Sequence, residues 1–180
     1  MKSVFVKTII LFFILTLGLS TSPVLARTVV LDFQANGFGK ITDPGASGCQ
    51  SDDQGCTVQS EGSVSSRHFG KAKFSSILKI LWKSATPNGE GASSSPAGFC
   101  APASGATEIA IGNAVLNLEQ VGIVCELGPT GTDVPHTFNG TFFITGGTNK
   151  YAGETGAGNL TVSDDGKGNV LLNLRGTIKR

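Results

Sequence analysis

Residues 160–178 alternate between apolar and polar side chains with a period of two, and this pattern constrains the fold of the 180-residue chain more than any other feature. The apolar phase lies on both sides of an Asp-Gly turn at residues 163–168, with Leu160 and Val162 before it and Val170, Leu172, Leu174 and Ile178 after it. Successive side chains of a β-strand point to opposite faces, so these residues would line one face of two strands. Two such runs around a short turn predict a β-hairpin whose apolar face other strands must cover.

The sequence predicts strands in other parts of the chain as well. Apolar and β-branched runs occupy residues 28–34, 121–127 and 138–145. Gly112-Asn113 predicts a second hairpin turn. Residues 74–83 fit either a helix or a strand, and we favour a strand because strands flank the segment. Seven or eight short strands and no convincing amphipathic helix predict a single all-β domain over residues 27–180, folded as an antiparallel barrel or sandwich.

The sequence predicts that strands are interrupted at two places. The first strand is expected to end before Asn36-Gly37, a turn-forming pair. Residues 84–106 contain 18 Gly, Ser, Ala or Pro among 23 positions, a composition that buries little apolar surface. The sequence therefore predicts a long surface loop over residues 84–106.

The N-terminal residues 1–26 have the pattern of a secretory signal peptide. Lys2 and Lys7 give a positive start, an apolar run follows from Thr8 to Leu19, and small residues end at Ala26. The apolar run is too short to span a bilayer, and no later stretch is long enough. We expect cleavage between Ala26 and Arg27, export to an extracellular or periplasmic space, and no transmembrane anchor in the mature chain.

The four cysteines all follow that segment. An even number of cysteines in an exported chain predicts two disulfides, and four cysteines allow three pairings. We favour Cys49 with Cys56, which would close a short polar loop, and Cys100 with Cys125. A zinc site is the alternative, but the C-x2-C spacing that such sites use is missing.

A short glycine-rich segment resembles a known family. Residues 140–158, which include Ile144, Gly146-Gly147-Thr148 and Tyr151, are similar to the strand–turn–strand signature of the allene oxide cyclase and dirigent barrels. Asn149 stands where that family usually has a third glycine, and Asn adopts positive φ more readily than most residues. The resemblance implies a calycin-like, eight-stranded antiparallel barrel with an apolar pocket that needs no cofactor.

Candidate functional residues are few. The polar or charged side chains that would suit a barrel pocket are Asp32, His68, Glu119, Tyr151 and Arg175. We favour a structural role for His68 and for Tyr151, which would close one end of the barrel, and we expect Asp32 to face solvent or a neighbour. The catalytic positions of the related families lie outside residues 140–158, so no catalytic residue is assigned.

The usual signatures of metal, phosphate and hydrolase sites are missing from the sequence. His68 and His136 are too few for a typical zinc site, and His136, which follows Pro135, is expected to be solvated. The chain has neither a G-x-S-x-G elbow nor a phosphate-binding loop, so we expect no metal and no cofactor. A formal net charge of +1 and 15% charged residues argue against a nucleic-acid partner.

Three functions follow from these features. A secreted small barrel that binds an apolar small molecule, or acts as a structural or interaction module, is favoured over an enzyme. The alternative is a cyclase or dirigent-type enzyme with a hydrophobic substrate in the barrel. That alternative requires acidic or basic side chains that face inward, with Asp32, His68, Glu119 and Arg175 as candidates.

Overall fold

The computed structural model describes residues 28–43, 55–87, 98–128 and 133–180. Within these ranges the chain forms nine β-strands, two short 3-10 turns and no α-helix. The strands are β1 (Val30–Asp43), β2 (Cys56–Ser66), β3 (Gly70–Ile80), β4 (Thr86–Pro87), β5 (Phe99–Ile111), β6 (Ala114–Glu126), β7 (His136–Gly147), β8 (Thr155–Asp164) and β9 (Asn169–Lys179). The 3-10 turns are η1 (Trp82–Ser84) and η2 (Asn149–Tyr151). The prediction of an all-β chain is confirmed.

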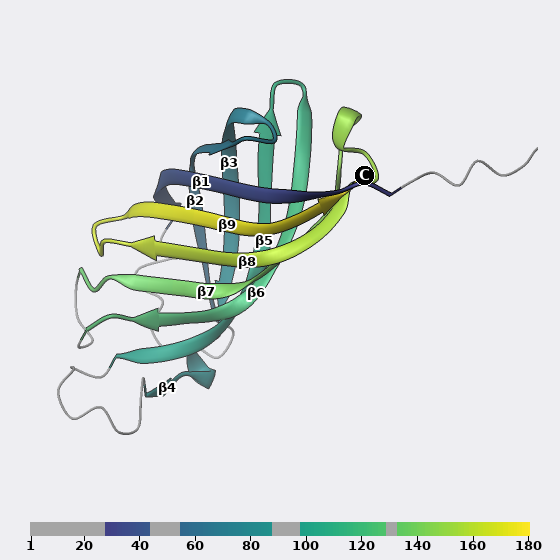
Figure 1. Cartoon of the computed structure of the whole chain (residues 1–180). Coiled ribbons are helices and arrows are strands. Elements are labelled where there is room, and N and C mark those ends of the chain that lie inside the picture. The colour runs from purple at the N-terminus through teal and green to yellow at the C-terminus, as the bar shows by residue number, and fades with distance from the viewer. Residues whose placement is uncertain (1–27, 44–54, 88–97, 129–132) are drawn as a thin grey trace, which may run out of the picture.

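Eight of the strands close into one antiparallel barrel. Their order around the sheet is β3-β2-β1-β9-β8-β7-β6-β5, and β3 pairs with β5 to complete the ring. Strands β1, β9, β8 and β7 lie side by side in Figure 1, with β2 and β3 on the far side. The two-residue strand β4 adds to β5 at one end. Closure leaves the eight long strands without an unpaired edge, and it confirms the predicted eight-stranded barrel.

The interior of the barrel is built from the alternating apolar residues. Phe138, Phe142 and Ile144 of β7 are all at most 3% exposed. Leu160, Val170, Leu172, Leu174 and Ile178 on β8 and β9 are also buried. The period-two pattern therefore identified the inward face of the C-terminal hairpin correctly, and this hairpin turns at residues 165–168.

Glycines face each other across neighbouring strands at three points of the barrel. The directly opposite pairs are Gly39 with Gly62, Gly122 with Gly140, and Gly158 with Gly176. A Cβ on Gly122 would lie 2.3 Å from the Asn139 carbonyl oxygen, closer than any real contact. Such close backbone approach marks the tight bends at which a sheet curls into a small barrel.

The strands are longer than the sequence breaks suggested. Strand β1 continues through Asn36 and Gly37 to Asp43, so the expected end before Asn36 is wrong. Asn36 stays in the strand because its side chain accepts a hydrogen bond from Asn173 Nδ2 of the neighbouring strand, at 2.6 Å. The expected loop is also wrong for residues 99–106, which belong to β5. Small residues are required there, since Ala101 and Ala103 are buried inside the barrel.

Three other local predictions can be compared with the structure. The strand predicted over residues 74–83 is confirmed for residues 74–80, which belong to β3, and is wrong at Trp82, where the 3-10 turn η1 begins. The β5–β6 hairpin turns at Gly112-Asn113, where Gly112 adopts φ +63°. Asn149 adopts φ +52°, which is the left-handed conformation expected of a residue that replaces glycine.

One disulfide joins directly opposite residues of two strands. Cys100 on β5 pairs with Cys125 on β6, with their Cα atoms 4.0 Å apart, as predicted. Cys56 is disulfide-bonded as well, and its expected partner Cys49 lies outside the described residues. The predicted signal peptide, residues 1–26, also lies outside them. In the part of the chain that the structure describes, no helix has the length and hydrophobicity to cross a membrane.

Candidate functional site

One end of the barrel is packed with aromatic side chains, and the other end contains a cavity. At one end, here called the η2 end, η2 carries Tyr151, which is 0% exposed. Its ring lies 6.4 Å from the ring of His68, which also packs edge-on against Phe33. Large aromatic side chains therefore fill the barrel at the η2 end.

The other half of the barrel contains a cavity of about 990 Å³. It lies toward the end at which β3, β6 and β8 finish and β7 and β9 begin, here called the cavity end. Most of its wall is apolar and includes Val58, Leu78, Phe138, Val162, Val170 and Leu172. The volume is at the upper end of the range of about 300–1,000 Å³ that is typical of small-molecule sites.

Three polar side chains meet in the wall of this cavity, halfway along the barrel. Ser76 and Gln120 line the cavity, and Thr107 lies next to both. The Thr107 hydroxyl lies 2.9 Å from Ser76 Oγ and 3.1 Å from Gln120 Oε1, and Gln120 Nε2 lies 3.1 Å from Ser76 Oγ. Thr107 and Gln120 are 3% and 5% exposed. A closed triangle of hydrogen bonds thus sits in a largely apolar wall, where Thr107 and Gln120 are buried and Ser76 is half-buried.

Charged side chains gather at the rim of the cavity end. His136 Nδ1 lies 3.2 Å from Asp164 Oδ2, and its ring lies 6.2 Å from that of Trp82. Glu126 accepts a hydrogen bond from the backbone N–H of Phe99. His136 begins strand β7 and lines the cavity, and its side chain remains 34% exposed, so it faces the cavity mouth and keeps part of the solvent contact expected of it. A carboxylate that orients an imidazole is the arrangement found in many general bases.

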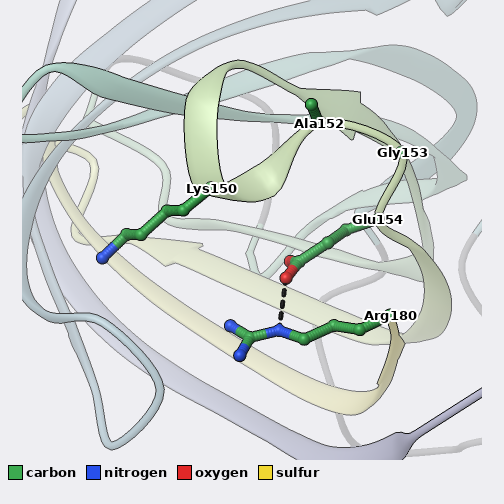
Figure 2. A pocket seen from close by; sticks show the side chains of 5 residues that line it. All are labelled: Lys150, Ala152, Gly153, Glu154 and Arg180. Carbon is green, nitrogen blue, oxygen red and sulfur yellow. Dashed lines mark hydrogen bonds and ion pairs between the residues drawn. The ribbon is translucent and has the colours of Figure 1, made fainter.

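A second, smaller hollow of about 200 Å³ lies at the η2 end, between η2 and the C-terminal residue Arg180. Figure 2 shows Glu154 and Arg180 directed toward each other there, with Lys150 farther away. Arg180 Nε donates to Glu154 Oε1 at 2.5 Å, and Arg180 Nη2 lies 3.0 Å from His68 Nε2. Glu154 is 3% exposed, so the guanidinium offsets the cost of burying its carboxylate.

His68 belongs to the same cluster. Burial lowers the pKa of His68 below its usual value of 6.5, and the positive charges of Arg180 and Lys150 lower it further, against the opposing effect of Glu154. A neutral imidazole is consistent with the geometry, because its Nε2 then accepts the N–H of Arg180. The arrangement ties the C-terminal residue to the β2–β3 turn.

None of the five residues selected from the sequence lines the large cavity. Asp32, Glu119 and Arg175 are exposed, His68 is half-buried, and Tyr151 is buried. The fold brings His68 and Tyr151 together at the η2 end and leaves the other three apart from them.

The polar residues in the cavity wall, Ser76 and Gln120, were missed, although part of the signal is visible in the sequence. Gln120 follows Leu116 and Leu118 in the same phase of strand β6, so it had to face inward with them. Ser76 continues the inward phase of Phe74 in the same way. Both could have been identified as polar residues at positions of the period-two pattern that are otherwise apolar.

Within the described ranges, no group of three or more His, Cys, Asp or Glu side chains is arranged to hold a metal ion. Comparisons of the chain with protein-family models, with curated proteins and with solved structures found no match.

Proposed function

We propose that this protein binds an apolar small molecule inside its barrel. The observation that carries the proposal is the cavity of about 990 Å³, whose wall combines many aliphatic and aromatic side chains with the polar groups of Ser60, Ser76 and Gln120 and with charged or titratable side chains at its rim. Such a wall is typical of ligand sites, in which apolar surface supplies affinity and a few polar groups supply orientation. A barrel that acted only as a structural module would have no need of an interior hollow, since filling it would stabilise the fold.

The proposal includes membership of the allene oxide cyclase and dirigent-like superfamily and export from the cytoplasm. The eight-stranded barrel and the turn at Asn149 with φ +52° both agree with that superfamily. The disulfide between Cys100 and Cys125 agrees with an oxidising compartment. The barrel and the turn thus support membership of the superfamily, the disulfide supports export, and the cavity supports binding of an apolar ligand.

An enzyme is the second candidate, favoured by the His136–Asp164 pair at the cavity rim. An imidazole held by a carboxylate beside an apolar pocket suits proton transfer to or from a bound substrate. We place it second because the residues expected to supply acid or base chemistry, Asp32, Glu119 and Arg175, are exposed on the outside of the barrel. If a bound compound is converted, His136→Gln should abolish the conversion and leave its binding intact.

The binding proposal is tested with a fluorescent apolar probe, N-phenyl-1-naphthylamine, titrated into the chain that begins at Arg27. Leu171 and Leu172 provide a matched pair of variants, because Leu172 is 5% exposed and lines the cavity whereas Leu171 is 63% exposed and points outward. We expect saturable binding, weakened at least severalfold by Leu172→Trp and unchanged by Leu171→Trp. Thermal unfolding of both variants verifies that they are folded.

Two results would overturn the proposal. The first is the absence of saturable binding to the folded protein for this probe and for a screen of apolar compounds by native mass spectrometry. The second is binding that Leu171→Trp weakens and Leu172→Trp does not, since the ligand would then lie on the outer surface.

A further inference from the structure

The triangle of Ser76, Thr107 and Gln120 has one more proton than its bonds can use. The three side chains carry two amide N–H groups and two hydroxyl O–H groups. The three contacts of the triangle each require one of these four protons. One donor therefore remains without a partner inside the triangle.

The remaining donor can be identified by elimination. Gln120 Oε1 can only accept, so the Thr107 hydroxyl donates to it, and the contact between Thr107 and Ser76 must then take its proton from Ser76. The contact between Gln120 Nε2 and Ser76 Oγ uses one amide N–H, and the second amide N–H is left over. If the amide N and O of Gln120 exchange places, each of the three hydrogen bonds of the triangle reverses its direction, and one amide N–H of Gln120 is again left over.

A spare donor at this place is costly unless something occupies the cavity. Gln120 is 5% exposed and lines the cavity, and a buried N–H without an acceptor costs about 1–3 kcal/mol. Trp82, also in the cavity wall, has its indole N–H buried without a partner among the described residues. Both groups are donors, so what they lack is an acceptor.

The rest of the wall defines the other properties of a fitting molecule. Facing strands β7, β8 and β9 contribute Phe138, Val162 and Leu172, so the far side is apolar. Among the described lining residues none is Lys or Arg, whereas Glu126, Asp133 and Asp164 lie toward the cavity end. An anionic ligand would meet these carboxylates and no Lys or Arg, and the one imidazole of the lining, His136, already lies beside Asp164, which disfavours free acids and phosphates.

We infer that the ligand is an uncharged apolar molecule with an oxygen acceptor, such as a ketone, ester or ether oxygen, and that this oxygen accepts the spare N–H of Gln120. The inference rests on the proposed binding function and names the class of ligand for that same cavity. Ser60, directly opposite Ser76 on β2, extends the polar strip along the wall beside the oxygen.

Three naphthalene compounds that differ in one substituent test the inference by isothermal titration calorimetry. We expect the ketone 2-acetylnaphthalene to bind about 3- to 10-fold more tightly than the hydrocarbon 2-ethylnaphthalene, as one net hydrogen bond provides. The carboxylate 2-naphthoate should bind more weakly than either.

Two glutamine-to-methionine variants, one in the cavity and one on the outer surface, test whether the amide of Gln120 causes the preference for the ketone. In Gln120→Met the unbranched side chain keeps much of the volume and loses the amide, and Ser76 and Thr107 can still pair with each other. This variant should lose the preference for the ketone, so that it binds the ketone and the hydrocarbon with equal affinity. Gln59→Met, at an exposed position of β2, should keep the full preference for the ketone.

The outcomes separate the two proposals. Equal affinities for ketone and hydrocarbon in the unaltered protein, a preference that survives Gln120→Met, or tightest binding of 2-naphthoate would overturn the inference and leave the binding function intact. If none of the three compounds binds and the apolar probe fails as well, the proposed function itself is wrong.

Discussion

Substituting Gly122 by alanine should destabilise the barrel strongly, although only one methyl group is added. A Cβ at this position would lie 2.3 Å from the carbonyl oxygen of Asn139 and 2.6 Å from Cα of Gly140. Both are backbone atoms of the neighbouring strand β7, so no side-chain rotation can relieve the contact. Strands β6 and β7 would have to separate by several tenths of an ångström at least at this pair of glycines.

The expected loss follows from this geometry. Overpacking in a dense interior typically costs about 1–3 kcal/mol, and a contact with backbone places Gly122→Ala at the upper end, at about 3 kcal/mol. For a domain of this size that loss lowers the Tm by roughly 6–12 °C. Thermal unfolding followed by far-ultraviolet circular dichroism, with urea unfolding for the free energy, measures both quantities.

Gly128 provides the matched control. It lies two residues beyond β6, its backbone is not left-handed, and the nearest described atom to an added Cβ would be Val134 Cγ1 at 4.0 Å. Gly128→Ala should therefore be neutral, or stabilising by about 0.4–1 kcal/mol through the unfolded state. If Gly122→Ala and Gly128→Ala unfold at the same temperature as the unaltered protein, close approach of the strands does not explain the paired glycines.

Three further predictions concern Tyr151, the disulfide and His68. Tyr151→Phe removes a buried hydroxyl that has no partner among the described residues, so the stability should stay equal or rise by up to about 1 kcal/mol, measured as Tm. Replacing Cys100 and Cys125 by alanine opens a cross-link between residues 25 positions apart and should cost roughly 3 kcal/mol in urea unfolding. Because the folded pKa of His68 lies below its unfolded value, the unfolded chain binds more protons between the two values, so the free energy of unfolding should rise with pH up to about 6.5. That rise should shrink in His68→Asn.

Each of these predictions has an outcome that contradicts it. A Tm that falls by more than about 4 °C in Tyr151→Phe would mean that the hydroxyl makes a stabilising bond. An unchanged free energy of unfolding without Cys100 and Cys125 would mean that the cross-link does not constrain the unfolded chain. For His68, a pH dependence that is the same before and after the substitution would assign the titration to another group.

Much of the fold could be predicted from local patterns. The alternation around residues 163–168 identified the inward face of β8 and β9, since burial of one face of a strand requires a period of two. Asn149 was expected to take a left-handed conformation, and it does so at φ +52°. These features depend on a few neighbouring residues, and short-range sterics decide them.

The extent of β1 and β5 could not be predicted in the same way. Asn36-Gly37 and the small residues of 99–106 have turn-like or loop-like composition, yet both segments are strands. Barrel closure explains the difference. Where strands bend sharply and approach closely, small side chains are needed inside, and a cross-strand partner such as Asn173 holds Asn36 in the sheet.

By itself the sequence determined the class of fold, the hairpins and the inward face of each C-terminal strand, because these follow from the alternation of side chains along an extended backbone. Only the tertiary structure decided which polar residues meet in the cavity. Ser76 is 31 residues from Thr107 and 44 from Gln120, and they come together because β3 pairs with β5 and so completes the ring. Register between distant strands depends on closure of the whole barrel, and no local pattern contains it.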